Sequence, residues 1–582
     1  MPTIPGASRK QAGAYYDKGG AVFHIKHPDF AGSTDGVTSN VAAYQSVMAA
    51  VAAAGGGKIK ISTGTYLFTI SSDTDTILIP SNTEIECEPG VVFKWGYWGS
   101  PLFAIVNRTN VRMRLNGAKF LWTGTFGKTV GASNKFGYGL AIPAYEWCAH
   151  IISVGSEFVE IEDAQCAGNT PANNQNLFVN FRGRADGSQT EGNQVRKLVI
   201  DDVCLGVGFG EQKRFVIDGI KANRFSNASN ALYGPGHVLY VVASTNGSEG
   251  GEISNIYDEG TALSGFVSGS HSVSLKKLKH TIVKNIHSRR AEGAVNFQDL
   301  ENVEIDFRHY TASGTDDLGC GPCFAVNPTV ANKYVKIRAT IIEDVHRDAC
   351  GINLRSISDG SKNLYCDVEL MHVRLTDGTN ANPVVAWVGN FGTCRVAAHN
   401  KGNSPKYIIN VYNRSTDNEF WVRALGTMPN PTVGVTSGLR NTFWTSSGSA
   451  LDYDPAEFTP SSGNAVIFES AHQYQSSKNV GSGANPTTTF QLPKPGAYLV
   501  HVNLISSDKN HARAGFYWVV FDRASTNDFT TAQLIGTQIA KGRLAPTVLT
   551  LSVSNAGLCT IASMAGPNTY LLRYGYRQLS PE

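Results

Sequence analysis

The segment that decides the fold begins at Asp35-Gly36-Val37-Thr38 and ends at Thr63-Gly64-Thr65-Tyr66. Its first turn leads into an alanine-rich stretch, where Ser39 or Asn40 can cap a helix. Apolar side chains then recur at the spacing of one helix face, at Val41, Tyr44, Met48 and Val51. The segment therefore predicts a short helix near the N-terminus.

A strand follows this helix directly. Gly55-Gly56-Gly57 ends the helix, and Lys58-Ile59-Lys60-Ile61 alternates between polar and apolar residues as a half-buried strand does. This order of turn, helix, glycines and strand resembles the N-terminal cap of pectate-lyase-like right-handed parallel β-helices. It resembles most closely the cap of bacteriophage tailspikes that depolymerise bacterial surface polysaccharide. Such a fold needs a cap because its first coil would otherwise expose apolar core and unpaired strand edges.

The composition is that of a large, β-rich protein. With 582 residues the chain is too long for one compact core, and 17% charged residues with 60 glycines fit many turns and few exposed helices. The formal net charge of +3 gives no reason to expect a nucleic-acid partner. No apolar run is long enough to span a membrane, and residues 1–20 lack the apolar core of a secretory signal.

The 10 cysteines predict neither a disulfide framework nor a metal site. Only Cys320-Gly321-Pro322-Cys323 has the spacing of a ligand pair, and a zinc site would need a second pair. We therefore expect single thiols packed as small apolar groups, synthesis in a reducing cytoplasm, and no cofactor.

Short apolar runs recur between about residues 110 and 425. One family places Ile220, Ile256 and Ile286 at equivalent positions, about 30 to 36 residues apart, which is the coil length of a solenoid. A propeller or an array of sandwiches would need tight hairpins every ~8–12 residues, and these are uncommon here. A second family of runs covers His237–Tyr240, Ala294–Phe297, Ala325–Pro328 and Gly351–Leu354. The predicted fold class is all-β: a right-handed parallel β-helix with a small α/β cap.

We expect five parts along the chain. Met428-Pro429-Asn430-Pro431 begins a linker-like region, and beyond about residue 466 the strands become longer and richer in aromatic residues, as in an antiparallel β-sandwich. The resemblance implies a jelly-roll-like module there that assists trimerisation and touches glycan. The parts are an N-terminal extension (1–24), the capping helix and first coils (25–109), the parallel β-helix catalytic domain (110–427), a linker (428–465) and the C-terminal β-sandwich (466–582).

Stacked coils predict a polar column on the outside of the second family of runs. Alternate residues of a strand point to opposite faces, so coils about 4.8 Å apart align their outward side chains along the rod. The interior then holds Val238, Tyr240, Val273, Leu275, Val295, Phe297, Ile352 and Leu354. The outside holds His237, Ser274, Lys276, Asn296, Gln298, Asn353 and Arg355. Such a column can bind a linear polymer, and the alternative is a merely solvated face.

The first family predicts a cluster of titratable side chains. The residues that follow its apolar positions are Arg224, Asp258, Glu259, His287, Arg289, Arg290 and His309, and the bordering turns add Glu211, Lys213, Tyr233 and His237. The alternative is a ladder of surface ion pairs, each worth little.

Two reactions fit these residues. Hydrolysis needs two carboxyl groups beside the glycosidic bond, for which Asp258, Glu259 and Glu211 are the candidates. Elimination needs a cation that neutralises a uronate carboxylate, together with a base and an acid. His237 would serve as base, or as acid with Tyr233, while Arg289, Arg290 and Lys213 hold the carboxylate. Basic and aromatic side chains outnumber acids in these coils, which favours a lyase over a glycosidase.

The resemblance implies a function and a setting. It implies a virion-attached depolymerase of capsular or O-antigen polysaccharide that mediates host attachment, is made in the host cytoplasm and acts at the bacterial surface. It also implies a homotrimer bound to the phage tail or baseplate through an N-terminal region, with no membrane or nucleic-acid partner. Two alternatives stay open: a non-catalytic receptor-binding spike, and a structural or adhesive bacterial β-helix protein.

Overall fold

The computed structural model forms two compact units, Met1–Asp344 and Val345–Glu582. It describes residues 14–17, 20–124, 132–168, 177–203, 205–225, 237–241, 246–261, 271–289, 293–311, 323–325, 332–343, 352–354, 361–362, 365–373, 385–400, 408–412, 415–425, 433–435, 438–445, 465–468, 473–480, 487–491, 496–506, 512–521, 531–541, 549–553, 558–563 and 570–578.

The predicted helix and strand near the N-terminus are confirmed. Helix α1 (Val41–Ala53) buries Tyr44, Val47, Met48 and Val51. The Asn40 side chain does not cap α1 as predicted, because its amide oxygen accepts a hydrogen bond from the Ser33 N–H (2.8 Å) instead. Strand β4 (Gly57–Ile61) follows. A side chain on Gly56 would meet the Asn82 carbonyl oxygen at 2.5 Å, so this turn requires glycine.

Helix α1 closes the first coils by packing an aromatic side chain onto their core. The Tyr44 ring lies 4.9 Å from the Phe68 ring in edge-to-face geometry, and the Phe93 and Phe120 rings continue the stack at 4.9 Å. All four side chains are buried. Each such burial contributes about 1.5–3 kcal/mol, so the helix covers apolar surface that water would otherwise reach.

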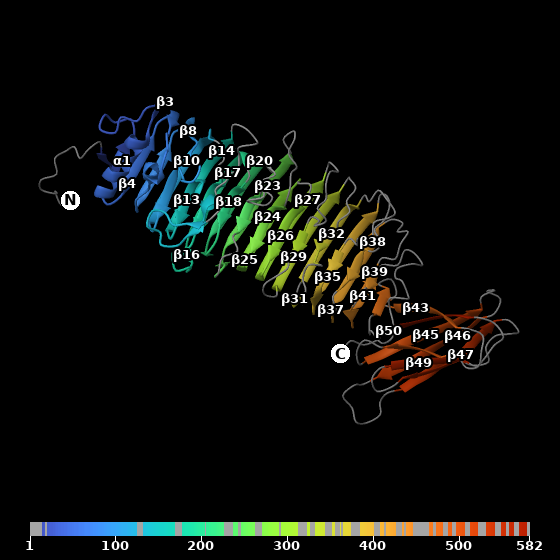
Figure 1. The fold of residues 1–582 in the computed structure, drawn as a ribbon. Helices are drawn as coiled ribbons and strands as arrows, with labels where there is room; N and C mark the ends of the chain where they lie inside the picture. Colours follow the sequence, from blue (N-terminus) through green and yellow to red (C-terminus); the bar gives the residue numbers. More distant parts are fainter. Residues whose placement is uncertain are drawn as a thin grey trace. The chain divides into compact units, whose positions relative to one another are not determined.

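The first unit is a parallel β-helix (Figure 1). One sheet, which we call the long-strand sheet, stacks its strands in parallel. They are β10 (Thr109–Trp122), β14 (Glu157–Gly168), β17 (Gln194–Val203), β20 (Val216–Phe225), β23 (Glu252–Thr261), β25 (Leu278–Ser288), β27 (Glu301–Thr311) and β29 (Lys333–Glu343). The β-helix predicted from the sequence is therefore confirmed.

The chain alternates between this sheet and a second, which we call the short-strand sheet. Its strands in the first unit are β6 (Ile77–Leu78), β9 (Phe103–Val106), β13 (Ala149–Val154), β15 (Leu177–Arg182), β18 (Leu205–Phe209), β21 (His237–Val241), β24 (His271–Lys276), β26 (Gly293–Gln298) and β28 (Cys323–Ala325). Short strands at the corner lead back to the long-strand sheet: β16 (Thr190–Glu191), β19 (Gln212–Lys213) and β22 (Ser248–Glu249). Cap strands β2 (Gly20–His24), β3 (Asp35–Ser39), β5 (Gly64–Leu67), β7 (Thr83–Cys87) and β8 (Val91–Trp95) complete the first coils.

The register confirms one predicted alignment and corrects two others. Ile220, Ile256 and Ile286 stack on one another as predicted. In the short-strand sheet, however, Leu239 rather than Val238 lies opposite Val273. Tyr240, which was predicted inside, therefore lies on the outward side with Ser274, and the predicted alignment of this strand is wrong by one residue. The partner of Val295 is likewise Cys323, not a residue of Ala325–Pro328.

The second unit contains parallel coils followed by antiparallel sheets. Its parallel strands are β32 (Tyr365–Val373), β35 (Thr393–Asn400), β38 (Glu419–Leu425) and β41 (Thr442–Thr445), with β30 (Ile352–Asn353), β33 (Val385–Trp387), β36 (Ile409–Val411) and β39 (Val433–Val435). One antiparallel sheet joins β43 (Gln473–Val480), β50 (Tyr570–Gln578), β45 (Gly496–Ser506), β46 (Ala512–Phe521) and β47 (Thr531–Lys541). Another joins β44 (Thr487–Gln491), β49 (Leu558–Ser563) and β48 (Leu549–Val553). A jelly-roll arrangement of these sheets and the domain limits drawn from the sequence stay predictions.

Two further expectations concern thiols and membranes. The cysteines whose side chains the structure describes are free and buried, as predicted: Cys87, Cys148, Cys166, Cys323, Cys394 and Cys559. Within the described ranges, no helix has both the length and the apolar character that crossing a bilayer requires.

Candidate functional site

The outward side of the short-strand sheet carries a column of aligned side chains, which we call the outer column. The register stacks Asn180, Gly208, Tyr240, Ser274, Asn296 and Phe324 on successive coils. Beside it, Lys276 lies opposite Gln298. Coils about 4.8 Å apart bring these side chains into one row, in which Tyr240, Asn296 and Phe324 are half-buried while Asn180 and Ser274 are buried. Four of the predicted outward residues, Ser274, Lys276, Asn296 and Gln298, belong to this face.

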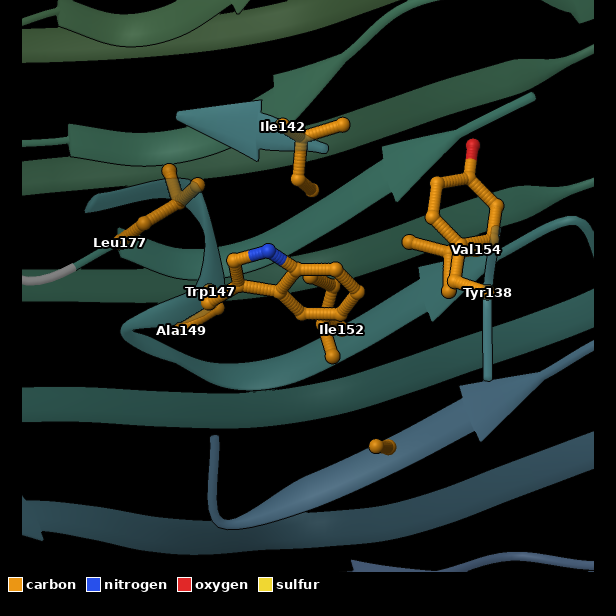
Figure 2. Close-up of a cluster of buried hydrophobic side chains, with 8 residues drawn as sticks. Tyr138, Ile142, Trp147, Ala149, Ile152, Val154 and Leu177 are labelled. Carbon is orange, nitrogen blue, oxygen red and sulfur yellow. The ribbon is translucent and has the colours of Figure 1, made fainter. Parts of the chain in front are cut away.

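One segment, residues 132–147, lies over the first coils of this face, and we call it the covering segment. It contains β11 (Ala132–Ser133), β12 (Ile142–Pro143) and α2 (Ala144–Trp147). Figure 2 shows the Trp147 ring between Leu177 on one side and Tyr138 on the other, within a buried apolar cluster. The Trp147 indole N–H donates to the Ser133 carbonyl (2.9 Å), and the Tyr138 hydroxyl donates to the Gly183 carbonyl (2.7 Å). These contacts fix the position of the residue that precedes Trp147.

That residue is Glu146, and it joins a buried cluster with Arg182 and Glu211, which we call the carboxylate–guanidinium cluster. Arg182 Nη1 donates to Glu146 Oε2 at 2.5 Å, and Arg182 Nε donates to Glu211 Oε2 at 3.0 Å. The exposed fractions are 1% for Glu146, 7% for Arg182 and 5% for Glu211. Two carboxyl groups therefore flank one guanidinium beside the outer column.

The surroundings of the cluster shift the pKa values of Glu146 and Arg182. Burial raises the pKa of Glu146, although the Arg182 charge opposes this rise. Burial by itself would lower the pKa of Arg182. The negative charges of Glu146 and Glu211 have the larger combined effect, so the pKa of the guanidinium is raised. The Asn180 amide donates to the Glu146 carbonyl (3.1 Å), while Glu146 Oε1 and Asn180 Oδ1 have no hydrogen-bond partner among the described residues. Environments that shift pKa values in this way are typical of acid–base catalysis.

Tyr240 borders the cluster on the outer column. It packs against the apolar cluster around Trp147, and burial together with the nearby Glu146 carboxylate raises its pKa. The His237 ring stacks on it, with centroids 5.5 Å apart and planes at 17°. His237 is itself buried and its Nδ1 lies 2.7 Å from the His271 carbonyl oxygen. The base predicted from the sequence therefore lies beside the outer column, held by its neighbours.

Other predicted residues lie at the corner where the long strands end. Asp258 is buried and accepts a hydrogen bond from the Ser272 hydroxyl (2.7 Å). The same Ser272 oxygen lies 2.7 Å from Ser288 Oγ. Glu259 and Arg289 form an ion pair at 3.4 Å, with side chains 46% and 61% exposed. A pair this exposed contributes little to stability.

Lys213 lies at the opposite corner of the coil. It pairs with Glu249 at 3.4 Å, and the register stacks it in line with Glu249 and Lys279. Arg289 follows Lys279 by ten residues of extended chain, about 30 Å. Lys213 and Arg289 therefore do not converge on one sugar unit, whereas Glu211 and the outer column do lie together.

The remaining predicted residues are scattered. His287 lies on the long-strand sheet, stacked on Tyr257 at 4.9 Å with its Nε2 2.7 Å from Asn285 Oδ1, and burial lowers its pKa. His309 is fully buried in β27. The Arg224 backbone lies in β20 opposite Thr261, and nothing is described of its side chain. Tyr233, Arg290 and Arg355 lie outside the described residues.

Sequence reasoning missed Glu146, Arg182 and Asn180. For two of them a signal was present: Leu177–Arg182 alternates, which places Asn180 and Arg182 on one face of a strand. Glu146 carries no such signal, because its role depends on a segment that lies over distant coils. Within the described ranges, no group of three or more His, Cys, Asp or Glu side chains could hold a metal ion.

Comparisons with known proteins identify distant structural neighbours. No protein-family model matches the chain, and no curated protein matches it. The tailspike gp49 from Acinetobacter baumannii bacteriophage Fri1, a capsular polysaccharide depolymerase, is 11% identical; the match covers 96% of this chain and 86% of that one, with a TM-score of 0.28. The tailspike of E. coli bacteriophage HK620, solved with a pentasaccharide, is 9% identical over 94% of this chain and 91% of that one, with a TM-score of 0.47. Both neighbours are phage tailspikes.

Proposed function

We propose that this chain is a depolymerase of bacterial surface polysaccharide that holds its substrate along the outer column. The observation that carries the proposal is the carboxylate–guanidinium cluster, in which two buried carboxyl groups share Arg182 beside a polar column on a parallel β-helix. A pair of carboxyl groups beside the glycosidic bond is the machinery of glycoside hydrolysis. We therefore favour hydrolysis as the reaction.

The roles within the cluster follow from its environment. Glu146, whose pKa is raised by burial, is the general acid that protonates the glycosidic oxygen. Glu211 is the base or nucleophile, and Arg182 holds both carboxyl groups in place. Glu146 Oε1 is shielded from water, so the sugar must displace a neighbouring side chain to reach it. Tyr240 borders the cluster and is only half-buried, which makes it the side chain that we expect to move.

Glutamine substitutions test these roles. The substrate is capsular polysaccharide from a strain on whose lawn the wild-type protein forms a translucent halo. We expect Glu146→Gln and Glu211→Gln to lower the release of reducing ends by about 10²–10⁴-fold, the usual contribution of a positioned acid or base. Glu259→Gln, in the exposed pair with Arg289, is the matched control and should cut normally. Normal cutting by both cluster variants would refute the assignment, and binding without any cutting by the wild type would favour a receptor-binding spike.

Elimination is the second candidate, and the position of Tyr240 favours it. Tyr240 has a raised pKa and its ring centre lies 5.3 Å from the Lys276 ammonium, so this cation would neutralise a uronate while the phenol transfers a proton. The products separate the two reactions. An ultraviolet absorbance from an unsaturated uronate indicates elimination, and reducing ends without that absorbance indicate hydrolysis.

The setting of this activity is proposed on the resemblance of the cap. The chain would form a homotrimer in the tail of a phage, attached to the tail or baseplate through an N-terminal region. It would be made in the host cytoplasm and would act at the bacterial cell surface.

A further inference from the structure

Lys276 is the starting point, because its side chain is half-buried and no carboxylate of the described residues pairs with it. Many lysines of the first unit form ion pairs with glutamates on neighbouring coils, for example Lys58 with Glu86 at 2.8 Å and Lys284 with Glu252 at 2.8 Å. Lys276 forms no ion pair with any described residue, and burial lowers its pKa. An ammonium group that loses water without gaining an anion is destabilising, unless a ligand supplies the anion.

The surroundings of Lys276 suit a sugar. Its ammonium lies 5.3 Å from the centre of the Tyr240 ring, within cation–π distance. Gln298 lies opposite Lys276 on the next coil, and Asn296 lies opposite Ser274. Asn296 Oδ1 is buried and has no hydrogen-bond partner among the described residues, so a sugar hydroxyl that displaces a neighbouring side chain would satisfy it. A cation, two amides and an aromatic ring thus occupy adjacent positions of the outer column.

We propose that Lys276 binds the carboxylate of an acidic sugar, with Asn296 and Gln298 holding hydroxyl groups of the same unit and Tyr240 lining its position. This inference rests on the proposed function and makes it more specific: the polymer carries a negatively charged sugar one or two coils from the carboxylate–guanidinium cluster. The sugar carboxylate supplies the negative charge that no described residue places beside Lys276. A neutral polymer would leave Lys276 uncompensated.

The test compares two forms of one polymer. Capsular polysaccharide from a strain that the wild-type protein clears is used as extracted, and also after chemical reduction of its carboxyl groups to alcohols. Binding to immobilised polymer is measured for the wild type, Lys276→Met and Lys276→Arg. Methionine keeps the apolar stem over Tyr240 and removes the charge. Lys284→Met, which removes a lysine from the other sheet of the same coil, is the matched control.

We expect Lys276→Met to bind the native polymer at least tenfold more weakly than the wild type, with Lys276→Arg in between and Lys284→Met unchanged. All proteins should bind the reduced polymer equally and weakly. Equal binding of the native polymer by Lys276→Met and the wild type would overturn the inference, as would unweakened binding of the reduced polymer by the wild type. Either result can coexist with normal cutting, so it leaves the proposed function standing; loss of cutting in the Glu146 and Glu211 variants is judged separately. Thermal melting of Lys276→Met shows whether the variant is folded.

Discussion

At the scale of single residues, three described charged groups that lose water on folding differ in what compensates them. Arg182 loses water but gains Glu146 and Glu211. Asp258 loses water but accepts the Ser272 hydroxyl. Lys276 has no such compensation among the described residues. Buried polar groups that lack partners in the free protein are the ones expected to bind a ligand, since elsewhere they only cost stability.

The raised pKa of Glu146 makes a prediction about stability and pH. Folding favours the neutral acid, so its contribution is complete below the unfolded-chain pKa of about 4.3 and is lost as pH rises through the higher folded value. The melting temperature of the wild type relative to Glu146→Gln should therefore fall as pH rises from about 4 to about 7. Differential scanning fluorimetry measures this difference. Glu259→Gln serves as the control, and a wild-type advantage that stays constant or grows with pH would contradict the prediction.

At the scale of elements, the covering segment is an addition to the β-helix and not part of its frame. Its side chains pack onto outward residues of the short-strand sheet, while the coils pair through their own strands. The segment supplies Glu146 to the carboxylate–guanidinium cluster. Loss of its packing should therefore affect the site more than the fold.

Trp147→Ala tests this separation. Removing a fully buried tryptophan costs about 3–5 kcal/mol locally, and it frees the residue that precedes it. We expect the variant to lose most polysaccharide cleavage while its far-ultraviolet circular dichroism keeps the β-sheet signal. Leu140→Ala, at an exposed position of the same segment, should keep its activity. Cleavage at the wild-type rate by Trp147→Ala would show that Glu146 needs no such support.

The elements were predictable to the extent that their patterns were local. Helix α1 and the stacking of Ile220, Ile256 and Ile286 follow from spacing alone. The register of β21 does not follow from spacing, because Val238 and Leu239 are adjacent apolar residues and either can be aligned with Val273. The cluster at Arg182 needed two facts that spacing does not contain: the path of the covering segment, and which coil Glu211 borders.

At the scale of the whole molecule, we expect a heat-resistant homotrimer. Coils that bury continuous apolar stacks resist local opening, and association adds stability that grows with concentration. Light scattering coupled to size-exclusion chromatography should give about three times the chain mass of 62.5 kDa. The melting temperature should rise with protein concentration. A mass of one chain, with melting independent of concentration, would contradict the trimer.

The pairing of the long strands has a consequence for how such a protein changes over generations. Each described long strand of the first unit from β14 to β27 pairs with the long strand before it and the long strand after it (Figure 1). A connection between two strands can therefore lengthen, shorten or change its chemistry while every rung keeps its partners. New outward chemistry can be acquired by changing connections and outward side chains, and the inherited framework does not need to be refolded each time.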